Sequence, residues 1–334
     1  MKRFVDLADF TRDEVLALLE LARRLERQPE PHALAGKLLG LVFFNPSLRT
    51  LASFQAAMAR LGGHSLVINP GQGSWQMETR AGVVMDGAAA EHVREGIPVL
   101  ASYCDALGIR VFAEGRDLAS DLAETTFSAM ASLTDKPLVN LESAVNHPCQ
   151  ALADWKTLDD LAVPRAGRFV LSWAYHPRAL PLAVPAAALH MAALRGMEVI
   201  VLRPEGFALP QAIMERARRA AAAAGGSVRE TSERTEALAG AHVLYVKEWG
   251  ATDRYGDAAA DAQLRGPLRN WCVRNDWFAG SPDCRVMHCL PVRRNCAIAD
   301  EVLDSTRSVV QREAYNRLPV QMAVLHRLLR ENPT

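Results

Sequence analysis

The sequence has no excess of charge of either sign and no long uninterrupted apolar run. Its 334 residues carry 38 Lys and Arg against 38 Asp and Glu, so the formal net charge is zero. Proteins that bind nucleic acid or an anionic membrane through their overall field carry surplus positive charge, so both classes are disfavoured. No stretch approaches about 18 uncharged apolar residues, and the first six residues contain no apolar segment of a secretory signal. We therefore expect a soluble, cytoplasmic protein.

Two common cofactor signatures are also absent. The six cysteines form no C-x-x-C pair and no zinc-ligand spacing, so they are most simply reduced thiols packed as small hydrophobic side chains; they are Cys104, Cys149, Cys272, Cys284, Cys289 and Cys296. No G-x-G-x-x-G run follows a predicted strand, which argues against a dinucleotide-dependent oxidoreductase. The sequence therefore predicts neither a structural metal nor a cofactor.

Short apolar runs alternate with amphipathic segments along the whole chain, which is long enough for two domains. Strands are expected at residues 38–44, 65–68, 108–112, 137–140, 168–173, 197–202 and 242–247, with a further apolar segment at 285–288. Helices are expected at residues 11–27, 50–61, 91–105, 180–195, 209–224 and about 315–331, the last with Pro319 in its first turn. This alternation predicts an α/β fold with parallel sheets flanked by helices, and 164–167 is a candidate boundary between its halves.

One strand is followed by groups suited to binding an anion. The run Phe43-Phe44-Asn45-Pro46-Ser47-Leu48-Arg49-Thr50 ends an apolar strand and opens a helix. Ser47 can cap that helix, whose free N–H groups favour an anion, while Arg49 and Thr50 add further donors. Taken alone, the same run is also typical of an ordinary helix cap with a solvated arginine.

Three other motifs lie at the ends of predicted elements. They are His147-Pro148-Cys149-Gln150, His288-Cys289-Leu290-Pro291 and Asn316-Arg317-Leu318. Each also has a structural interpretation: a loop histidine, an inert buried thiol, or an arginine at a helix start. Arg110 lies within the strand at 108–112, where it needs an anion or a paired acid. In parallel α/β sheets ligands bind beyond the carboxyl ends of strands, where these motifs are expected.

With these motifs in this order, the sequence resembles the aspartate/ornithine carbamoyltransferase family, most closely the branch that acts on N-acylated ornithine. The resemblance implies a carbamoyl-phosphate-binding domain at residues 1–150, an acylornithine-binding domain at 151–314, and a C-terminal helix at 315–334 that packs back on the first domain. It also implies a homotrimer with shared active sites and no cofactor. The loop with Trp75 would be a lid, a core anchor or a contact between chains; by resemblance it reaches into a neighbouring subunit's site.

The resemblance also assigns roles to residues. The phosphate would be held by Ser47, the backbone of Leu48, Arg49, Thr50, Arg317 and the loop residue Trp75. The carbonyl oxygen would be polarised by Thr50, Arg110 and His147, which are the expected catalytic residues. The carbamoyl NH₂ would be fixed by Gln150 and the backbone carbonyls of Cys289 and Leu290. The acylornithine would be bound by Glu142, His176, Lys247, Arg293 and Ala90.

The identity of the amine substrate depends on two further stretches. The Asp-x-x-x-Ser-Met-Gly run by which ornithine carbamoyltransferases recognise a free α-amine is absent, and residues 173–178 and 247–250 match the N-acylornithine branch. Acetylornithine enzymes carry a Glu shortly after Met-Asp-Gly, where succinylornithine enzymes carry a Pro and this chain has Ala90. An alanine there would not repel a succinyl carboxylate.

We therefore expect N-succinyl-L-ornithine to be carbamoylated to N-succinyl-L-citrulline in arginine biosynthesis. The first alternative is N-acetyl-L-ornithine, because Glu91 lies only one residue from Ala90. The second alternative is a two-domain α/β protein that binds anions without turnover.

Overall fold

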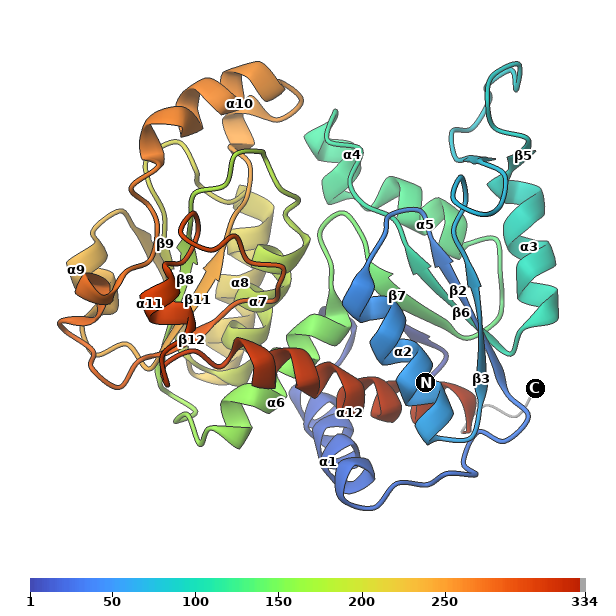
Figure 1. Ribbon diagram of the computed structural model, residues 1–334, viewed down its shortest axis with the longest axis horizontal. Coiled ribbons are helices and arrows are strands. Elements are labelled where there is room, and N and C mark those ends of the chain that lie inside the picture. Colours follow the sequence, from blue (N-terminus) through green and yellow to red (C-terminus); the bar gives the residue numbers. More distant parts are fainter. Residues whose placement is uncertain (331–334) are drawn as a thin grey trace. The chain divides into compact units, whose positions relative to one another are not determined.

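The protein, described here by a computed structural model over residues 1–330, divides into two compact units (Figure 1). The first unit contains residues 1–114, 119–149 and the chain from Arg317 onward, and the second contains 115–118 and 150–316. The chain passes between units inside helices α6 (Pro148–Asp160) and α12 (Val310–Leu329), and it also enters and leaves the second unit at the short segment 115–118. Residues 164–167 lie within the second unit.

The first unit is built on a five-stranded parallel sheet with strand order β1-β7-β6-β2-β3. Its strands are β1 (Arg3–Phe4), β2 (Leu38–Phe43), β3 (His64–Ile68), β6 (Ala106–Arg110) and β7 (Leu138–Glu142). Its helices are α1 (Arg12–Arg27), α2 (Leu48–Arg60), α3 (Val93–Tyr103), α4 (Leu118–Leu122) and α5 (Thr125–Ala131). Two short strands, β4 (Met77–Glu78) and β5 (Glu91–His92), pair with each other outside this sheet.

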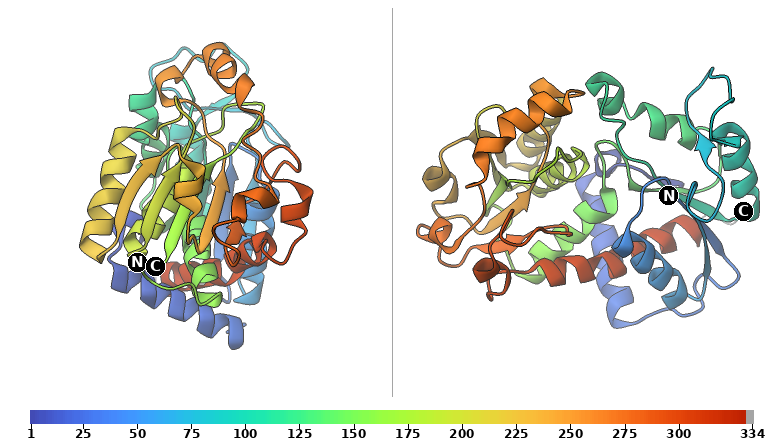
Figure 2. Two further views of the ribbon diagram at one scale, coloured as in Figure 1. Left: turned by 90° about the vertical axis from the view of Figure 1, so that its left-hand side faces the viewer. Right: turned by 45° about the horizontal axis from the view of Figure 1, so that its top comes forward.

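The second unit contains a second five-stranded parallel sheet, with order β10-β9-β8-β11-β12. The left view of Figure 2 shows its strands side by side. They are β8 (Arg168–Trp173), β9 (Glu198–Leu202), β10 (Ser227–Thr231), β11 (Val243–Lys247) and β12 (Arg285–Met287). Besides most of α6, the helices are α7 (Ala183–Arg195), α8 (Gln211–Ala224), α9 (Arg234–Leu238), α10 (Ala258–Arg265) and α11 (Asp300–Leu303).

The expected fold class is confirmed: the central strands are largely apolar and are buried on both faces, and the charged residues Arg110, Glu142 and Lys247 lie at their carboxyl ends. All residues of β6, β7 and β11 are buried, as are five of the six in β2 and in β8. Covering helices follow from local signals: α1 starts at a capping box in which Thr11 N donates to Glu14 Oε2 over 2.7 Å. Among residues 1–330, no helix combines the length and apolar character needed to cross a bilayer.

The C-terminal helix returns to the first unit, as expected, and lies next to α1 and α2 (Figure 1). His326 Nε2 is 3.2 Å from Glu30 Oε2, just beyond α1, and Arg317 donates to Thr50 in α2. The helix begins at Val310, however, five residues before the expected start. Pro319 is therefore its tenth residue, and the expectation that this proline occupies the first turn is wrong.

Several elements escaped the sequence analysis for physical reasons. Strand β10 has the sequence Ser-Val-Arg-Glu-Thr and lies at the edge of its sheet, so it lacks the continuous apolar run of a central strand. Strand β1 has only two residues. Helix α6 is buried over most of its circumference, which removes the contrast between apolar and polar faces that identifies a surface helix.

Substitution of a glycine in β6 tests how tightly the first sheet is packed. A Cβ at Gly108 would lie 2.8 Å from Leu141 Cδ2, closer than real Cβ atoms approach, and 3.1 Å from Leu41 Cδ2, so that these leucine side chains would have to shift. We expect Gly108→Ala to lower the free energy of unfolding by about 1–3 kcal/mol, as overpacking does in other cores. Urea denaturation measures this loss. The matched variant Gly87→Ala, where no atom lies within 4 Å of the new Cβ, should change stability much less. Equal losses in both variants would contradict the packing argument.

Candidate active site

The loop between β2 and α2 presents a helix N-terminus with its cap in place. Ser47 is the N-cap residue, and its Oγ accepts a hydrogen bond from Thr50 N over 3.2 Å. Upstream, Asn45 Oδ1 accepts from Phe112 N over 2.8 Å, which fixes the turn that leads into the helix. Leu48 is 81% exposed, so the first turn is open to solvent. Its free backbone N–H groups and partial positive charge are suited to an anion.

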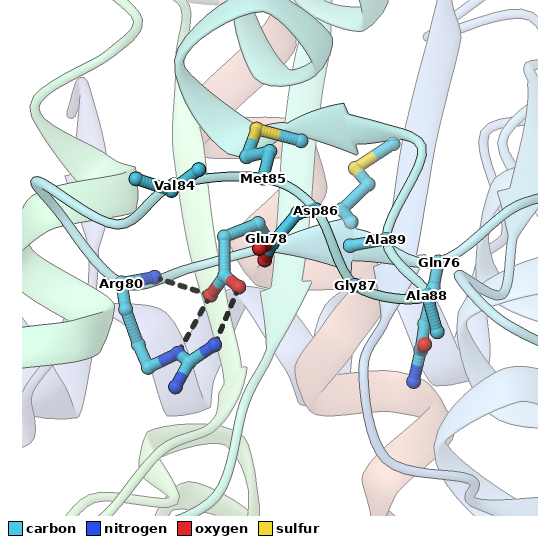
Figure 3. Close-up of a pocket in the computed structure, with 10 residues that line it drawn as sticks. Gln76, Glu78, Arg80, Val84, Met85, Asp86, Gly87, Ala88 and Ala89 are labelled. Atoms are coloured by element: carbon cyan, nitrogen blue, oxygen red, sulfur yellow. Dashed lines mark hydrogen bonds and ion pairs between the residues drawn. The ribbon is translucent and has the colours of Figure 1, made fainter.

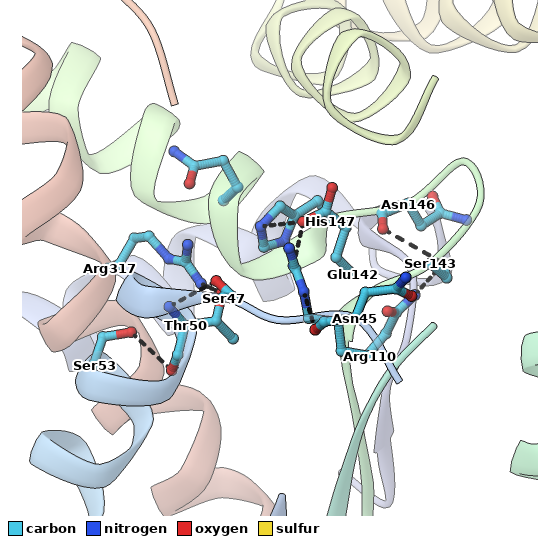
Figure 4. A network of polar contacts seen from close by, with 12 residues as sticks. Asn45, Ser47, Thr50, Ser53, Arg110, Glu142, Ser143, Asn146, His147 and Arg317 are labelled. Carbon is cyan, nitrogen blue, oxygen red and sulfur yellow. Dashed lines mark hydrogen bonds and ion pairs between the residues drawn. The ribbon is translucent and has the colours of Figure 1, made fainter. Parts of the chain in front are cut away.

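An arginine from the C-terminal helix completes this surface. Arg317 Nη2 donates to Thr50 Oγ1 over 2.8 Å, and the two side chains are almost fully buried (Figure 4). Burial lowers the pKa of Arg317, and the neighbouring charges of Arg110 and Arg49 lower it further. The guanidinium groups therefore disfavour one another, an arrangement that an anion between them would stabilise. We call Ser47, Leu48, Arg49, Thr50 and Arg317 the phosphate cradle.

Arg110 and Glu142 form an ion pair at the carboxyl ends of β6 and β7. Arg110 Nη1 donates to Glu142 Oε2 in a short contact, and Arg110 Nε donates to Asn45 O over 3.1 Å. The register between the strands shifts at this point, so that Ile109 is opposite Asn140 but Arg110 is opposite Glu142. This irregularity brings the two side chains to the same edge of the sheet. Glu142, assigned from the sequence to the acylornithine, thus contacts a residue assigned to carbamoyl phosphate.

His147 lies against the same ion pair. Its Nε2 is 3.4 Å from Glu142 Oε2, and its buried Nδ1 has no hydrogen-bond partner among the described residues. Burial holds the pKa of His147 well below its usual range, and the positive charges of Arg317, Arg110 and Arg49 lower it further. A neutral imidazole can donate a hydrogen bond to a carbonyl oxygen without adding another positive charge to this site.

A half-buried carboxylate that the sequence analysis missed holds the segment leading to His147. Glu124 accepts hydrogen bonds from Ser143 Oγ over 2.6 Å and from the backbone N–H groups of Ala144 and Val145 over 3.1 and 3.0 Å. Asn146 Nδ2 donates to it as well, over 3.0 Å. Glu124 follows a polar, short helix and lies far along the chain from its partners, so nothing local marks it. The resulting clamp fixes the approach of the chain to His147.

In the second unit, His176 and Arg293 come together. Arg293 Nε donates to His176 Nε2 over 2.9 Å, and His176 Nδ1 lies 2.9 Å from Arg178 O. Since Nε2 accepts from Arg293, a neutral ring carries its proton on Nδ1 and donates to Arg178 O, and Arg178 N, 3.0 Å from Nδ1, then finds no acceptor there. Burial, together with the charge of Arg293, lowers the pKa of His176, which favours that neutral form. The histidine therefore orients the guanidinium of Arg293.

Lys247 belongs to a buried chain of charges that includes a residue missed from the sequence. Its Nζ lies 2.7 Å from Glu248 Oε2, and Glu248 Oε1 lies 3.4 Å from His288 Nε2. His288 Nδ1 accepts from Leu290 N over 2.9 Å, so the ring carries its proton on Nε2 and donates it to Glu248. The chain links Lys247 to the backbone around Cys289 and Leu290. Lys247 is thus an ion-paired cation, and Glu248 shares its charge.

The loop that contains Trp75 and Ala90 is exposed. Trp75 is 60% exposed, and its Nε1 donates to Glu91 Oε2 over 2.7 Å. Ala90 N donates to Gln76 O over 3.1 Å. The segment between them lines a cavity of about 290 Å³, in which Arg80 and Glu78 form a two-point ion pair with contacts of 2.8 and 3.0 Å (Figure 3). Hydrogen bonds from Arg80 lower the pKa of Glu78 to about 2.

The described structure thus groups the predicted residues into sets. Ser47, Arg49, Thr50, Arg110, Glu142, His147 and Arg317 lie together in the first unit. His176 and Arg293 form one pair in the second unit, and Lys247 is linked through Glu248 and His288 to the segment with Cys289 and Leu290. Across residues 1–330 no group of three or more His, Cys, Asp or Glu side chains is arranged to hold a metal ion.

Comparison with known protein families gives matches over both halves of the chain. Residues 2–160 match the aspartate/ornithine carbamoyltransferase carbamoyl-P binding domain, and residues 184–328 match the Asp/Orn binding domain of the same family. The N-acetylornithine carbamoyltransferase of Xanthomonas campestris pv. campestris is 36% identical over 333 residues, covering 98% of each chain. The N-succinylornithine carbamoyltransferase of Bacteroides fragilis is also 36% identical, over 299 residues and 89% of each chain.

Solved structures with the same fold include ligand complexes. Acetylornithine transcarbamylase complexed with acetylcitrulline superimposes with a TM-score of 0.94 at 36% identity, covering 98% of this chain and 99% of that one. A variant of that enzyme with one glutamate replaced by alanine, solved with carbamyl phosphate and N-succinyl-L-norvaline, gives the same TM-score and identity and covers 98% of this chain and 100% of its own.

The cradle predicts the effect of removing Arg49. We expect Arg49→Ala to weaken carbamoyl phosphate binding by about 3 kcal/mol, about 100-fold, because two charge-assisted hydrogen bonds are lost. Isothermal calorimetry measures this change. Arg60→Ala is the matched control, since Arg60 is exposed at the other end of the same helix. Unchanged affinity in Arg49→Ala would exclude Arg49 from the cradle.

The environment of His147 predicts its protonation state. The pKa of His147 is lower in the folded than in the unfolded protein. The contribution of His147 to the free energy of unfolding is therefore present above the unfolded pKa of about 6.5 and is lost as the pH falls below that value. In an NMR titration, the imidazole signal that disappears in His147→Asn should not titrate between about pH 8 and 6, whereas His147 in urea-unfolded protein should titrate near 6.5. A midpoint near 6.5 in the folded protein would refute the neutral form.

Proposed function

Because the chain belongs to the aspartate/ornithine carbamoyltransferase family, we propose that it transfers the carbamoyl group of carbamoyl phosphate to the side-chain amine of N-succinyl-L-ornithine. The products would be N-succinyl-L-citrulline and phosphate, and the reaction would serve arginine biosynthesis. The chain is a carbamoyltransferase, so the alternative of an anion-binding protein without turnover is set aside. The proposal that the acyl group is succinyl rests on Ala90.

The reaction needs a bound phosphate, donors for a developing oxyanion and a neutral amine. The cradle binds the phosphate group, and Thr50, Arg110 and His147 donate hydrogen bonds to the carbonyl oxygen. Glu142 supports this role, since it orients Arg110 and lies 3.4 Å from His147. The amine nitrogen attacks the carbonyl carbon, the C–O bond to phosphate breaks, and the leaving phosphate accepts the amine proton.

Gln150 and the backbone carbonyls of Cys289 and Leu290 complete the proposed carbamoyl subsite by accepting hydrogen bonds from its NH₂. Arg293, oriented by His176, and Lys247, paired with Glu248, are the cations proposed for the carboxylates of the acylornithine. Because Glu248 already shares the charge of Lys247, Arg293 is expected to contribute more of the attraction.

The absence of a carboxylate at position 90 supports the succinyl group as the acyl group of the substrate. We align Ala90 with the glutamate that follows Met-Asp-Gly in acetylornithine enzymes. A carboxylate there would face the extra carboxylate of a succinyl group, at a cost of about 1 to 4 kcal/mol for charges about 4 Å apart near a surface. The neighbouring Glu91 is held by Trp75 over 2.7 Å, which directs its carboxylate to the indole. Variants of the acetylornithine enzyme with one glutamate replaced were solved with N-succinyl-L-norvaline.

The second candidate substrate is N-acetyl-L-ornithine. It is favoured by the extent of similarity, since the acetylornithine enzyme of Xanthomonas campestris pv. campestris matches over 333 residues and the succinylornithine enzyme of Bacteroides fragilis over 299. A phosphate-release assay with carbamoyl phosphate and each of ornithine, N-acetylornithine and N-succinylornithine separates the candidates. The proposal requires the highest kcat/KM with N-succinylornithine.

We also propose a homotrimer in which the loop with Trp75 and Ala90 reaches the neighbouring subunit's site. The supporting observation is the exposure of three large apolar side chains on this loop, namely Trp75, Val84 and Met85. Monomeric proteins rarely expose a group of large apolar side chains to water unless that group contacts a partner. Light scattering coupled to gel filtration measures the mass in solution, and a monomer of 36.5 kDa with full activity would refute shared sites.

Substitution at position 90 should change the acyl preference. We expect Ala90→Glu to lower the ratio of kcat/KM for N-succinylornithine to that for N-acetylornithine by about tenfold or more, because a carboxylate then opposes the succinyl carboxylate. Steady-state kinetics with both substrates measures the ratio. Ala88→Glu is the matched control, since it adds the same charge to the same exposed loop. A ratio that is unchanged in Ala90→Glu, or that changes equally in both variants, would remove Ala90 from the acyl pocket.

A further inference from the structure

A pair of fully buried carboxyl groups lies beside Gln150 in the second unit, and the mechanism above does not use it. Asp154 is one turn further along α6, and Glu313 is in the first part of α12. Neither side chain is exposed to solvent. Two buried carboxyl groups in contact cannot both be ionised at low cost, so their presence here requires an explanation.

The two carboxyl groups together bind both hydrogens of the Gln150 amide. Gln150 Nε2 donates to Asp154 Oδ1 over 2.8 Å and to Glu313 Oε1 over 3.3 Å. The opposite orientation of the amide would place its oxygen against two acceptors. The observed orientation leaves Gln150 Oε1 as a buried acceptor without a hydrogen-bond partner among the described residues. An orphaned acceptor of this kind is satisfied by a ligand N–H.

Glu313 also reaches the other proposed part of the carbamoyl subsite. His288 N donates to Glu313 Oε2 over 2.8 Å, and His288 immediately precedes Cys289 and Leu290. One carboxyl group therefore connects the Gln150 amide to the segment whose backbone carbonyls are proposed to bind the carbamoyl NH₂. A displacement of Glu313 would disturb the two sets of acceptors together.

We propose that Asp154 and Glu313 share one proton and act as positioning residues, which fix the Gln150 amide so that its Oε1 accepts a hydrogen bond from the carbamoyl NH₂. The role extends the proposed function, since it rests on Gln150 binding that NH₂ group. By this arrangement the enzyme selects an NH₂ over a methyl group on the phosphate donor, because a methyl group leaves the aligned acceptors unpaired.

Electrostatics at the pair agree with a shared proton. Burial raises the pKa of Glu313 well above its ordinary value, and the negative charge of Asp154, which also hydrogen-bonds to it, raises it further. Tyr245 faces the same pair, and burial and both carboxyl groups raise its pKa. Cys289 also lies near Tyr245. With one proton between the two carboxyl groups, a single negative charge remains on the pair, and Asp154 Oδ1, Glu313 Oε1 and Glu313 Oε2 keep lone pairs that accept from Gln150 and His288.

Selectivity between two stable ligands tests the positioning role. Phosphonoacetamide carries an NH₂ where acetonylphosphonate carries a methyl group, and both carry the same phosphonate, so effects on the phosphate cradle cancel in the ratio of their dissociation constants. We expect Glu313→Leu to reduce the preference for the amide at least tenfold. Glu313→Gln should give a preference between those of the wild type and Glu313→Leu, because its single amide oxygen can replace only one of the two acceptors that Glu313 offers to His288 N and Gln150 Nε2. Glu198→Gln, which alters an ion pair with Arg168 on β8 and β9, is the control.

A general loss of structure in Glu313→Leu would weaken the binding of both ligands equally and would leave the ratio of their dissociation constants unchanged. An unchanged ratio in a folded Glu313→Leu variant therefore overturns the proposal. Should Glu313→Leu fail to fold, Asp154→Ser removes the other carboxyl group and is expected to reduce the same ratio. Failure of the wild-type enzyme to bind either phosphonate would instead count against the proposed function.

Infrared spectroscopy tests the shared proton in the wild-type protein. A protonated carboxylic acid should be visible at pH 8 through its C=O stretch, should shift in deuterium oxide, and should disappear in Glu313→Gln but remain in Glu198→Gln. The absence of this band from the wild-type spectrum would overturn the shared proton.

Discussion

Buried guanidinium groups at the carboxyl edge of the first sheet are the feature on which the structure depends. Arg110 and Arg317 are only 7% and 3% exposed, and a buried charge is costly unless hydrogen bonds and opposite charge surround it. Arg110 is stabilised by Glu142, and Arg317 by the hydroxyl of Thr50. These contacts join β6, β7, α2 and α12, segments that lie far apart in the sequence. The return of α12 to the first unit is thus required for the site as well as for the core.

The same charges determine which chemistry the site favours. Three guanidinium groups disfavour a proton on His147, and positive charge of this kind near the N-terminus of α2 is suited to an anion. The histidine therefore contributes a neutral hydrogen-bond donor, and the arginines supply the positive charge. In the second unit neutral imidazoles have a similar role, since His176 orients Arg293 and His288 holds the backbone N–H of Leu290. At these two positions the histidine orients or holds a neighbouring group.

The sequence predicted the central strands and most long helices because burial on both faces of a parallel sheet requires apolar runs that can be recognised locally. It did not reveal the polar edge strand β10 or the true start of α12. The motif residues were singled out because several of them follow strands or open helices and because the motifs resemble those of the family. Arg317, expected at a helix start, is instead the eighth residue of α12. Glu124, Glu248, Asp154 and Glu313 were not, because the burial of a carboxylate depends on tertiary packing. Glu124 and Glu313 contact residues distant in sequence, and the nearby partners Lys247 and Gln150 do not by themselves mark Glu248 and Asp154 as buried.

The residues proposed to bind the two substrates are under different structural constraints. Thr50, Arg110 and Arg317 are buried in a network where a substitution leaves an unpaired charge, which typically costs about 3–5 kcal/mol. Ala90 lies on an exposed loop, where a substitution costs little stability. If the proposed roles hold, changes in acyl preference are more easily accommodated than changes in the proposed carbamoyl phosphate site. The equal identity of 36% to an acetylornithine and a succinylornithine enzyme is consistent with that difference.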